Sequence, residues 1–298
     1  MSGLRLPDPM LRPIKNMRTL ALASLLAGSL AACGGGDGSG GPLGDDVTTG
    51  DDTSSVDGGH TSSGKVGSIW VSRYSYTHPQ TGTIDGSSVS AQFYPQQPST
   101  WNDTADAGCY MSTYTTGPGT QFAQTSAGTV KFGTSPPTTL VPDGSGTYMA
   151  ATMENPLSGN ISVDVSGATV PAFTGTATIP PAAILTQPSI VAGKLTINRA
   201  TDLVVKWTGG GGDVSITVGS AFSGGSTMVN CVFAASAHQG TVPANLLSQL
   251  PTGTTGSFGA SIQAKTMKDA GDWTIWIGAT NSVNTTDGAS ASATATLQ

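Results

Sequence analysis

The sequence predicts an all-β protein built as an antiparallel β-sandwich. Downstream of residue 65, short runs rich in Val, Ile, Thr, Tyr and Trp recur between Gly, Pro, Asp and Ser, which is the pattern of strands and turns. Within these runs the side chains alternate, so that Leu203, Val205 and Trp207 would lie on one face of a strand and Val204 and Lys206 on the other. Such alternation favours antiparallel strands over parallel strands, which are usually apolar throughout.

The segments that fit this pattern continue to the C-terminus, as expected for a sandwich of the immunoglobulin-like or jelly-roll type. In chain order they are residues 68–76, 88–94, 109–115, 128–132, 146–153, 160–165, 173–179, 194–197, 203–207, 214–220, 228–234, 257–267, 272–280 and 289–297.

One segment has a helical pattern, and another is a candidate connection. Pro243 suits a first helical turn and Pro251 would end the helix within two turns, so residues 242–251 are expected to cap an edge or end of the sandwich. The Pro-rich residues 179–188 are expected to connect the two sheets, or to join two lobes that meet near residues 180–190. We favour one continuous unit, because Cys109 and Cys231 flank this segment.

The N-terminal part has a different composition. Residues 20–30 form an uncharged run rich in Leu and Ala, which follows Arg12, Lys15 and Arg18 and ends in Leu30-Ala31-Ala32-Cys33. A basic region, a short apolar region and small residues are typical of a secretory signal, and the run is too short to span a bilayer.

Leu30-Ala31-Ala32-Cys33 resembles the lipobox of bacterial lipoproteins. The resemblance covers residues 1–33, and it implies that residues 1–32 are a signal peptide and that Cys33 is acylated. Met17 would open a more conventional signal than Met1. Gly34 stands where the enterobacterial sorting rule places Asp for inner-membrane retention, so the resemblance implies the outer membrane. The alternative is an ordinary secretory signal in which these four residues occur by chance.

Residues 34–64 contain six Asp, no Lys or Arg and no aromatic residue. A segment of this composition cannot bury enough apolar surface to fold. Residues 33–64 are therefore expected to be a lipidated Cys followed by a disordered tether, and residues 65–298 to be the folded ectodomain.

The chain contains three Cys and has a formal net charge of -6. If Cys33 is acylated, Cys109 and Cys231 remain as a pair that would form a disulfide in an oxidising compartment. The alternative is two buried thiols that act as small apolar residues. Lys and Arg are not clustered, which argues against nucleic acid as a partner.

The predicted ectodomain offers few groups for catalysis. It contains two His, His78 and His238, and one Glu, Glu154, without zinc-ligand spacing or a Gly-x-Ser-x-Gly motif. Residues 143–146 and 269–272 are expected to be turns rather than calcium loops. We therefore expect no metal, no cofactor and no enzyme activity. The alternative is a hydrolase that uses a Ser/His/Asp site without a motif, or a pair of Asp.

Aromatic residues favour a binding role. Tyr74 and Tyr76 would share a face with Trp70, and Trp101 lies in a polar loop. Aromatic rings can stack on sugar rings while their polar atoms reach hydrogen-bond partners. We expect Tyr76 and Trp101 to contribute to a ligand site. The Trp residues expected to pack in the core are Trp70, Trp207, Trp273 and Trp276.

Together these features predict a lipid-anchored lipoprotein of the bacterial cell envelope with a non-catalytic, binding or structural ectodomain. Its expected partners are the membrane, through the lipid anchor, and a glycan or another envelope component. A secreted hydrolase is the alternative from a different class.

Overall fold

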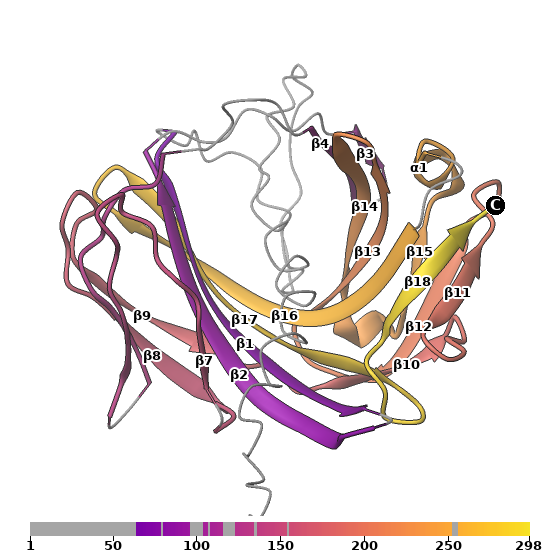
Figure 1. The fold of residues 1–298 in the computed structure, drawn as a ribbon, viewed down its shortest axis with the longest axis horizontal. Coiled ribbons are helices and arrows are strands. Elements are labelled where there is room, and N and C mark those ends of the chain that lie inside the picture. Colours follow the sequence, from indigo (N-terminus) through magenta and orange to yellow (C-terminus); the bar gives the residue numbers. More distant parts are fainter. Residues whose placement is uncertain are drawn as a thin grey trace, which may run out of the picture. The chain divides into compact units, whose positions relative to one another are not determined.

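A computed structural model describes residues 64–78, 80–95, 104–106, 108–115, 123–133, 136–153, 155–251 and 256–298 (Figure 1). The structure is mostly β, with 63% strand and 3% helix, and its sheets pack in a sandwich-like arrangement. This result confirms the predicted fold class. Cys33, residues 34–63 and Trp101 lie outside the described residues, so the expectations for the signal, the lipid anchor, the tether and Trp101 stay predictions.

The strands follow the predicted segments closely. They are β1 (Val66–His78), β2 (Gly82–Tyr94), β3 (Thr104–Asp106), β4 (Cys109–Thr115), β5 (Val130–Phe132), β6 (Thr138–Leu140), β7 (Ala151–Met153), β8 (Asn160–Val165), β9 (Phe173–Thr178), β10 (Ala183–Gln187), β11 (Lys194–Ile197), β12 (Leu203–Gly209), β13 (Asp213–Phe222), β14 (Gly225–Ala234), β15 (Gln239–Val242), β16 (Gly256–Ala270), β17 (Trp273–Thr285) and β18 (Ser292–Leu297).

Two sheets contain these strands. A 14-stranded sheet follows the order β15-β12-β10-β17-β16-β13-β14-β4-β3, with β1, β2, β7, β11 and β18 paired beside this path. The second sheet has the order β6-β5-β8-β9. Most pairs are antiparallel, as predicted, but β1 and β10 both run parallel to β17, and β11 runs parallel to β18.

Buried side chains form two clusters. The first core contains Phe93, Phe132 and Trp273, and the rings of Phe93 and Trp273 meet edge to face with centroids 6.5 Å apart. The second core contains Trp207 and Ile216. The hairpin of β16 and β17 contributes side chains to both cores. Residues from its closed end join the first core (Ala270, Trp273, Ile275 and Ile277), and residues from its open end join the second (Phe258, Ile262 and Val283).

The parallel neighbour of β17 changes along its length. Residues 274–280 pair with β1, whereas residues 283–285 pair with β10. At the change, Asn281 Nδ2 donates to the Pro180 carbonyl oxygen over 2.9 Å, and Asn281 Oδ1 accepts from the Ser282 N–H over 2.8 Å. We call this place the fork. Asn281 therefore ties the Pro-rich segment to the shared hairpin.

The Pro-rich segment 179–188 passes from one core to the other, since Ile179 belongs to the first core and Ala183 to the second. Its second half is β10, a strand that the sequence does not predict. Pro180 and Pro181 precede this strand and Pro188 follows it, and Pro is typical of connections, so the sequence pattern does not predict a strand here. The other unpredicted strands, β3, β6 and β15, have three or four residues, too few for alternation to stand out.

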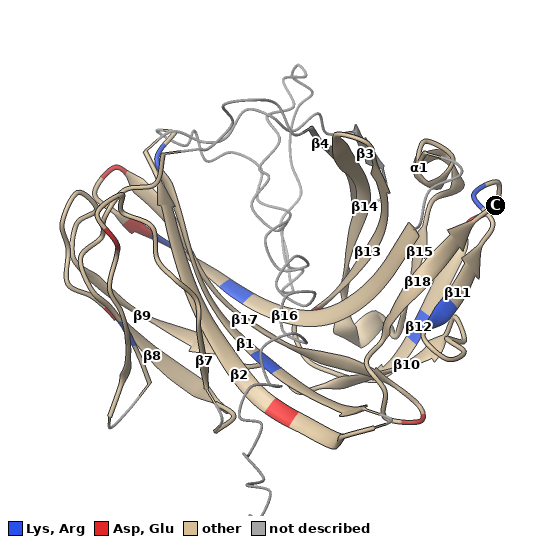
Figure 2. Ribbon diagram, viewed as in Figure 1, with Lys and Arg blue, Asp and Glu red and all other residues tan. Residues whose placement is uncertain are grey.

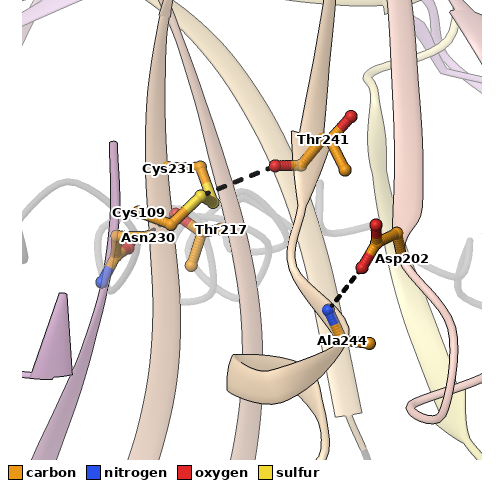
Figure 3. Close-up of a disulfide and its surroundings, with 7 residues drawn as sticks. All are labelled: Cys109, Asp202, Thr217, Asn230, Cys231, Thr241 and Ala244. Carbon is orange, nitrogen blue, oxygen red and sulfur yellow. Dashed lines mark hydrogen bonds between the residues drawn. A yellow bond between two sulfur atoms is a disulfide. The ribbon is translucent and has the colours of Figure 1, made fainter. Parts of the chain in front are cut away.

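The predicted helix is α1 (Ala244–Leu247), shorter than expected. Pro243 is its N-cap residue and has an extended backbone, so the expectation that Pro243 occupies the first helical turn is wrong. Asp202 Oδ1 accepts from the Ala244 N–H over 2.8 Å, as Figure 3 shows. The Arg199 guanidinium donates to the carbonyl oxygens of Ser248 and Leu250 just beyond the helix. These hydrogen bonds tie α1 to the segment between β11 and β12, and Leu246 and Leu247 pack in the second core.

Cys109 and Cys231 are joined by a disulfide between β4 and β14 (Figure 3). The two residues are direct partners in the sheet, and each is at most 1% exposed. The Cys109 sulfur also lies 3.8 Å from the Thr241 carbonyl oxygen of β15. The bridge therefore closes a sequence separation of 122 residues and lies within the second core.

Replacing both Cys with Ala should lower the free energy of unfolding by about 2 to 5 kcal/mol, because the bridge restricts the unfolded chain. Urea unfolding of the oxidised full chain and of the double variant would measure the difference. Non-reduced peptide mapping should recover a peptide that links Cys109 to Cys231. Two free thiols in the folded, oxidised protein would contradict the bridge.

Candidate functional site

The strongest candidate for a binding surface is one face of the 14-stranded sheet. In β1, Ile69 and Val71 point into the first core, so Ser68, Trp70 and Ser72 point to the opposite face. The registers continue this face across the neighbouring strands. We call it the polar face; it comprises Ser68, Trp70, Ser72, Tyr74 and Tyr76 of β1, Ser88, Ser90 and Gln92 of β2, Trp276, Gly278 and Thr280 of β17, and Gln263, Lys265 and Met267 of β16.

Directly paired residues form rows across this face. One row consists of Ser90, Trp70, Gly278 and Lys265. The next consists of Ser88, Ser72, Thr280 and Gln263, and it continues to Asp213 of β13. The first row therefore holds one aromatic ring, that of Trp70, and the second row holds hydroxyl groups and the amide of Gln263, which is 6% exposed.

Two aromatic rings of the polar face lie against the backbone of a neighbouring strand. A Cβ atom at Gly278 would stand 2.4 Å from the Trp70 ring, and a Cβ atom at Gly86 would stand 2.6 Å from the Tyr74 hydroxyl. The absence of a side chain at these two Gly makes room for the rings, a common use of Gly in sheets. Trp70 is consequently only 8% exposed, whereas Tyr74 and Trp276 are half-buried.

Charge is sparse on this face. Figure 2 shows few charged residues on the strands involved. By register and alternation, Lys265, Asp269 and Asp213 lie on or beside the face, and Asp85 of β2 is near Tyr74. Burial raises the pKa of Asp213, and the nearby Lys265 ammonium opposes that rise. Burial also raises the pKa of Tyr74, with a further contribution from Tyr76 and Asp85. Tyr74 therefore stays a neutral hydroxyl donor at physiological pH.

Tyr76 lies on the polar face and is half-buried, opposite Ile84 of β2. Its predicted partner in the ligand site, Trp101, lies outside the described residues. The structure places Trp207 and Trp273 in the cores, as expected. Trp70 is buried, but it lies on the polar face outside both core clusters. Trp276 is half-buried and packs in neither core, so the expectation for Trp276 is wrong. Its neighbours Ile275 and Ile277 take the core side of β17, and alternation leaves Trp276 on the polar face.

Sequence reasoning also missed the amide and hydroxyl residues of this surface. The sequence does not predict Gln263, Thr280 or Ser90 as site residues, because polar residues are common on strands and none of the three belongs to a motif. Their common face becomes visible only when the register between strands is known. The available signal was the alternation around Trp276, which places Thr274, Trp276 and Gly278 opposite the apolar residues of the same strand.

The two His of the predicted ectodomain lie in different parts of the fold, His78 at the end of β1 and His238 after β14. His78 Nδ1 accepts from the Gln80 N–H over 3.2 Å, and His238 is exposed at the end of the 3₁₀ turn η1 (Ala235–Ala237). Among the residues that the structure describes, no hydrogen bond joins either imidazole to a Ser or Asp side chain, and no group of three or more His, Cys, Asp or Glu could hold a metal ion. Within the same residues, no helix is long and apolar enough to cross a membrane.

The two acidic segments form turns, as expected. Asp143 Oδ1 accepts hydrogen bonds from the N–H groups of Ser145 and Thr147 and from the Ser145 hydroxyl, and these bonds lower the pKa of Asp143. Asp272 pairs with the Lys65 ammonium at 2.5 Å, which lowers the pKa of Asp272. Both carboxylates are therefore engaged within the chain.

The structure also contains two open clefts, the larger of which includes Asp269 beside the polar face. The larger, of about 670 Å³, is lined by the ends of β8, β9 and β16 and carries Asp164, Lys268 and Asp269. The smaller, of about 390 Å³, lies at the fork.

Comparisons with known proteins identify no relative, since no protein-family model, no curated protein and no solved structure matches this chain.

Gly278→Ala should force the Trp70 ring to move and lower the free energy of unfolding by about 1 to 3 kcal/mol, the usual cost of overpacking. Gly259→Ala in β16 is the matched control, because a Cβ atom there meets nothing within 4 Å. Thermal unfolding and tryptophan fluorescence of both variants measure the effect. Equal changes in the two variants would contradict the packing of Trp70 on Gly278.

Proposed function

We propose that this protein is a lipid-anchored lipoprotein of the bacterial cell envelope, held through Cys33 in the outer membrane, and that its β-sandwich ectodomain binds a neutral glycan on the polar face. The main support for a binding role is the set of side chains on that face. Four adjacent strands present aromatic rings together with hydroxyl and amide groups, and few charges.

A glycan suits this chemistry better than other ligands do. The CH face of a sugar ring stacks on aromatic rings such as Trp276 and Tyr74, and the sugar hydroxyls exchange hydrogen bonds with Ser, Thr and Gln side chains. A nucleic acid or another strongly anionic polymer would require several clustered Lys or Arg. On the polar face the cationic group is Lys265, with Asp213 nearby.

The proposed location is supported by the N-terminal sequence. The lipobox-like residues 30–33 follow a basic and then an apolar segment, and the Gly/Ser/Asp composition of residues 34–64 suits a spacer between a membrane and a folded domain. The disulfide between Cys109 and Cys231 fits an oxidising compartment.

Cys33→Ser should abolish incorporation of radioactive palmitate and block removal of the signal, because the sulfur is the proposed acylation site. The measurement is metabolic labelling of the full chain in the bacterial host, followed by electrophoresis. Cys109→Ser is the control and should keep its label. Unchanged labelling of Cys33→Ser would contradict the lipoprotein assignment.

Trp276→Ala and Tyr76→Ala should each weaken glycan binding by more than about 1 kcal/mol, a loss of fivefold or more in affinity, as expected for aromatic anchors. A glycan and peptidoglycan array with the full chain in detergent would identify the ligand, and calorimetry would measure the affinities. Val204→Ala removes an exposed apolar side chain of β12, away from the polar face, and is the control. Turnover of ester, peptide or glycoside substrates that is lost in His78→Ala or His238→Ala would favour a hydrolase instead.

A further inference from the structure

One edge of β16 is paired along only part of its length. On that edge β13 pairs with residues 256–263, whereas β17 occupies the opposite edge from residue 261 to residue 270. Among the described strands, none pairs with residues 264–270 on the β13 side. We call residues 264–270 the free edge. Its exposed residues are Lys265, Thr266, Lys268 and Asp269.

The odd-numbered residues of the free edge direct their backbone groups outward. The hairpin closes with Ala270 opposite Trp273, and the closing pair of a two-residue turn is hydrogen-bonded, so the even-numbered residues bond to β17. The carbonyl oxygen of Gln263 agrees with this pattern, because a Cβ atom at Gly212, just before β13, would stand 2.4 Å from it. The odd-numbered N–H and C=O groups therefore point away from β17.

These outward groups belong to Lys265, Met267 and Asp269, and within the described part of the chain no strand meets them. Unpaired N–H and C=O groups at a sheet edge are a template for one more strand. The connection beside the edge, residues 209–212, consists entirely of Gly, so it places no side chain in the way of such a strand. The free edge is therefore open to pairing.

The charges at the free edge restrict which strand can pair there. Lys265 and Asp269 lie on the polar face, symmetrically about Met267, and neither forms a salt bridge with another described residue. Asp213 is close enough to Lys265 to interact electrostatically, but it forms no salt bridge with it. Lys residues on an edge usually discourage pairing with a further strand. A matching strand must therefore place a carboxylate opposite Lys265 and a cation opposite Asp269.

A second copy of the same edge meets this requirement. When two copies run antiparallel with Met267 opposite Met267 of the second copy, Lys265 of each copy lies opposite Asp269 of the other. Each of these pairs has its backbone groups directed at the interface, so each pair can exchange two hydrogen bonds.

Other symmetric registers are less favourable. A pair centred on Lys265 or on Asp269 sets like charges opposite each other, which is destabilising in a sheet. A pair centred on Thr266 or on Lys268 leaves Lys265 without a carboxylate opposite it. The pair centred on Met267 is the symmetric register that matches the charges.

We infer that the free edge is a self-association surface, at which two copies of this chain pair antiparallel about Met267 and join their large sheets. Because Lys265, Met267 and Asp269 lie on the polar face, the polar faces of the two copies then lie on the same side of the joined sheet. A single strand pair is small compared with the roughly 1,200 to 2,000 Å² of a stable interface, so the dimer is weak and reversible. The inference does not depend on glycan binding.

Cysteine cross-linking tests the position of the two-fold axis. In a hydrogen-bonded antiparallel pair the Cα atoms are about 5.5 Å apart, within the range of about 4.4 to 6.8 Å that a disulfide spans. The full chain carrying Met267→Cys, kept in detergent with a mild oxidant, should therefore form a dimer whose peptide map contains a 267–267 linkage. Thr296→Cys, at an exposed position of β18 away from the free edge, is the collision control and should give little linkage.

A charge exchange tests the register without a new Cys. Sedimentation equilibrium of the unmodified full chain in the same detergent should show a monomer–dimer equilibrium. Lys265→Asp sets two carboxylates opposite each other, so it should weaken self-association about tenfold. Adding Asp269→Lys to this variant restores opposite charges and should restore the dimer.

Unfolding temperatures show whether each variant is folded, and the charge exchange decides the outcome if Met267→Cys is not. A full chain that stays monomeric overturns the inference. So does a 267–267 linkage no stronger than that of the Thr296→Cys control. A dimer that Lys265→Asp leaves unchanged, or that the double variant does not restore, forms through another surface and also overturns it. Glycan binding enters none of these measurements, so the two proposals fail separately.

Discussion

The hairpin of β16 and β17 is the element on which the rest of the structure depends. It supplies Trp273, Ile275 and Ile277 to the first core and Phe258, Ile262 and Val283 to the second. Because both strands continue through the two cores, neither core can be completed without the same pair of strands. Asn281 lies where the parallel neighbour of β17 changes from β1 to β10. Its side chain donates a hydrogen bond to the Pro180 carbonyl oxygen, which would otherwise be buried without a partner.

Packing on one side of this hairpin determines the chemistry of the other side. The core residues of β1, β2 and β17 fill alternate positions, so the remaining positions form a continuous second face. On that face Gly278 and Gly86 allow the Trp70 and Tyr74 rings to lie against the backbone. The proposed glycan site is therefore a consequence of strand register, and its rigidity comes from the core beneath it.

The sequence predicts the fold class and most strands, because alternation in segments such as residues 203–207 is a local signal. The sequence does not predict β10, because Pro180, Pro181 and Pro188 indicate a connection and the five residues of the strand are too few for alternation to outweigh that signal. The disulfide follows from the count of Cys, but the direct pairing of Cys109 with Cys231 requires the register. The polar face and the fork cleft join residues distant in sequence, such as Arg73 and Asn284, so no local pattern could reveal them. Of the predicted ligand residues, Tyr76 lies on the polar face, and Trp101 stays a prediction.

The central claim is that the shared hairpin makes the two cores one cooperative unit. Native-state hydrogen exchange of Val163→Ala tests it directly. Val163 of β8 is 1% exposed in the first core, and its truncation should cost about 2 kcal/mol. If the cores unfold together, the most protected amides of β13, in the second core, should lose the same free energy of protection as those of β8. Loss of protection in β8 with β13 unchanged would show that the cores unfold independently and would contradict the claim.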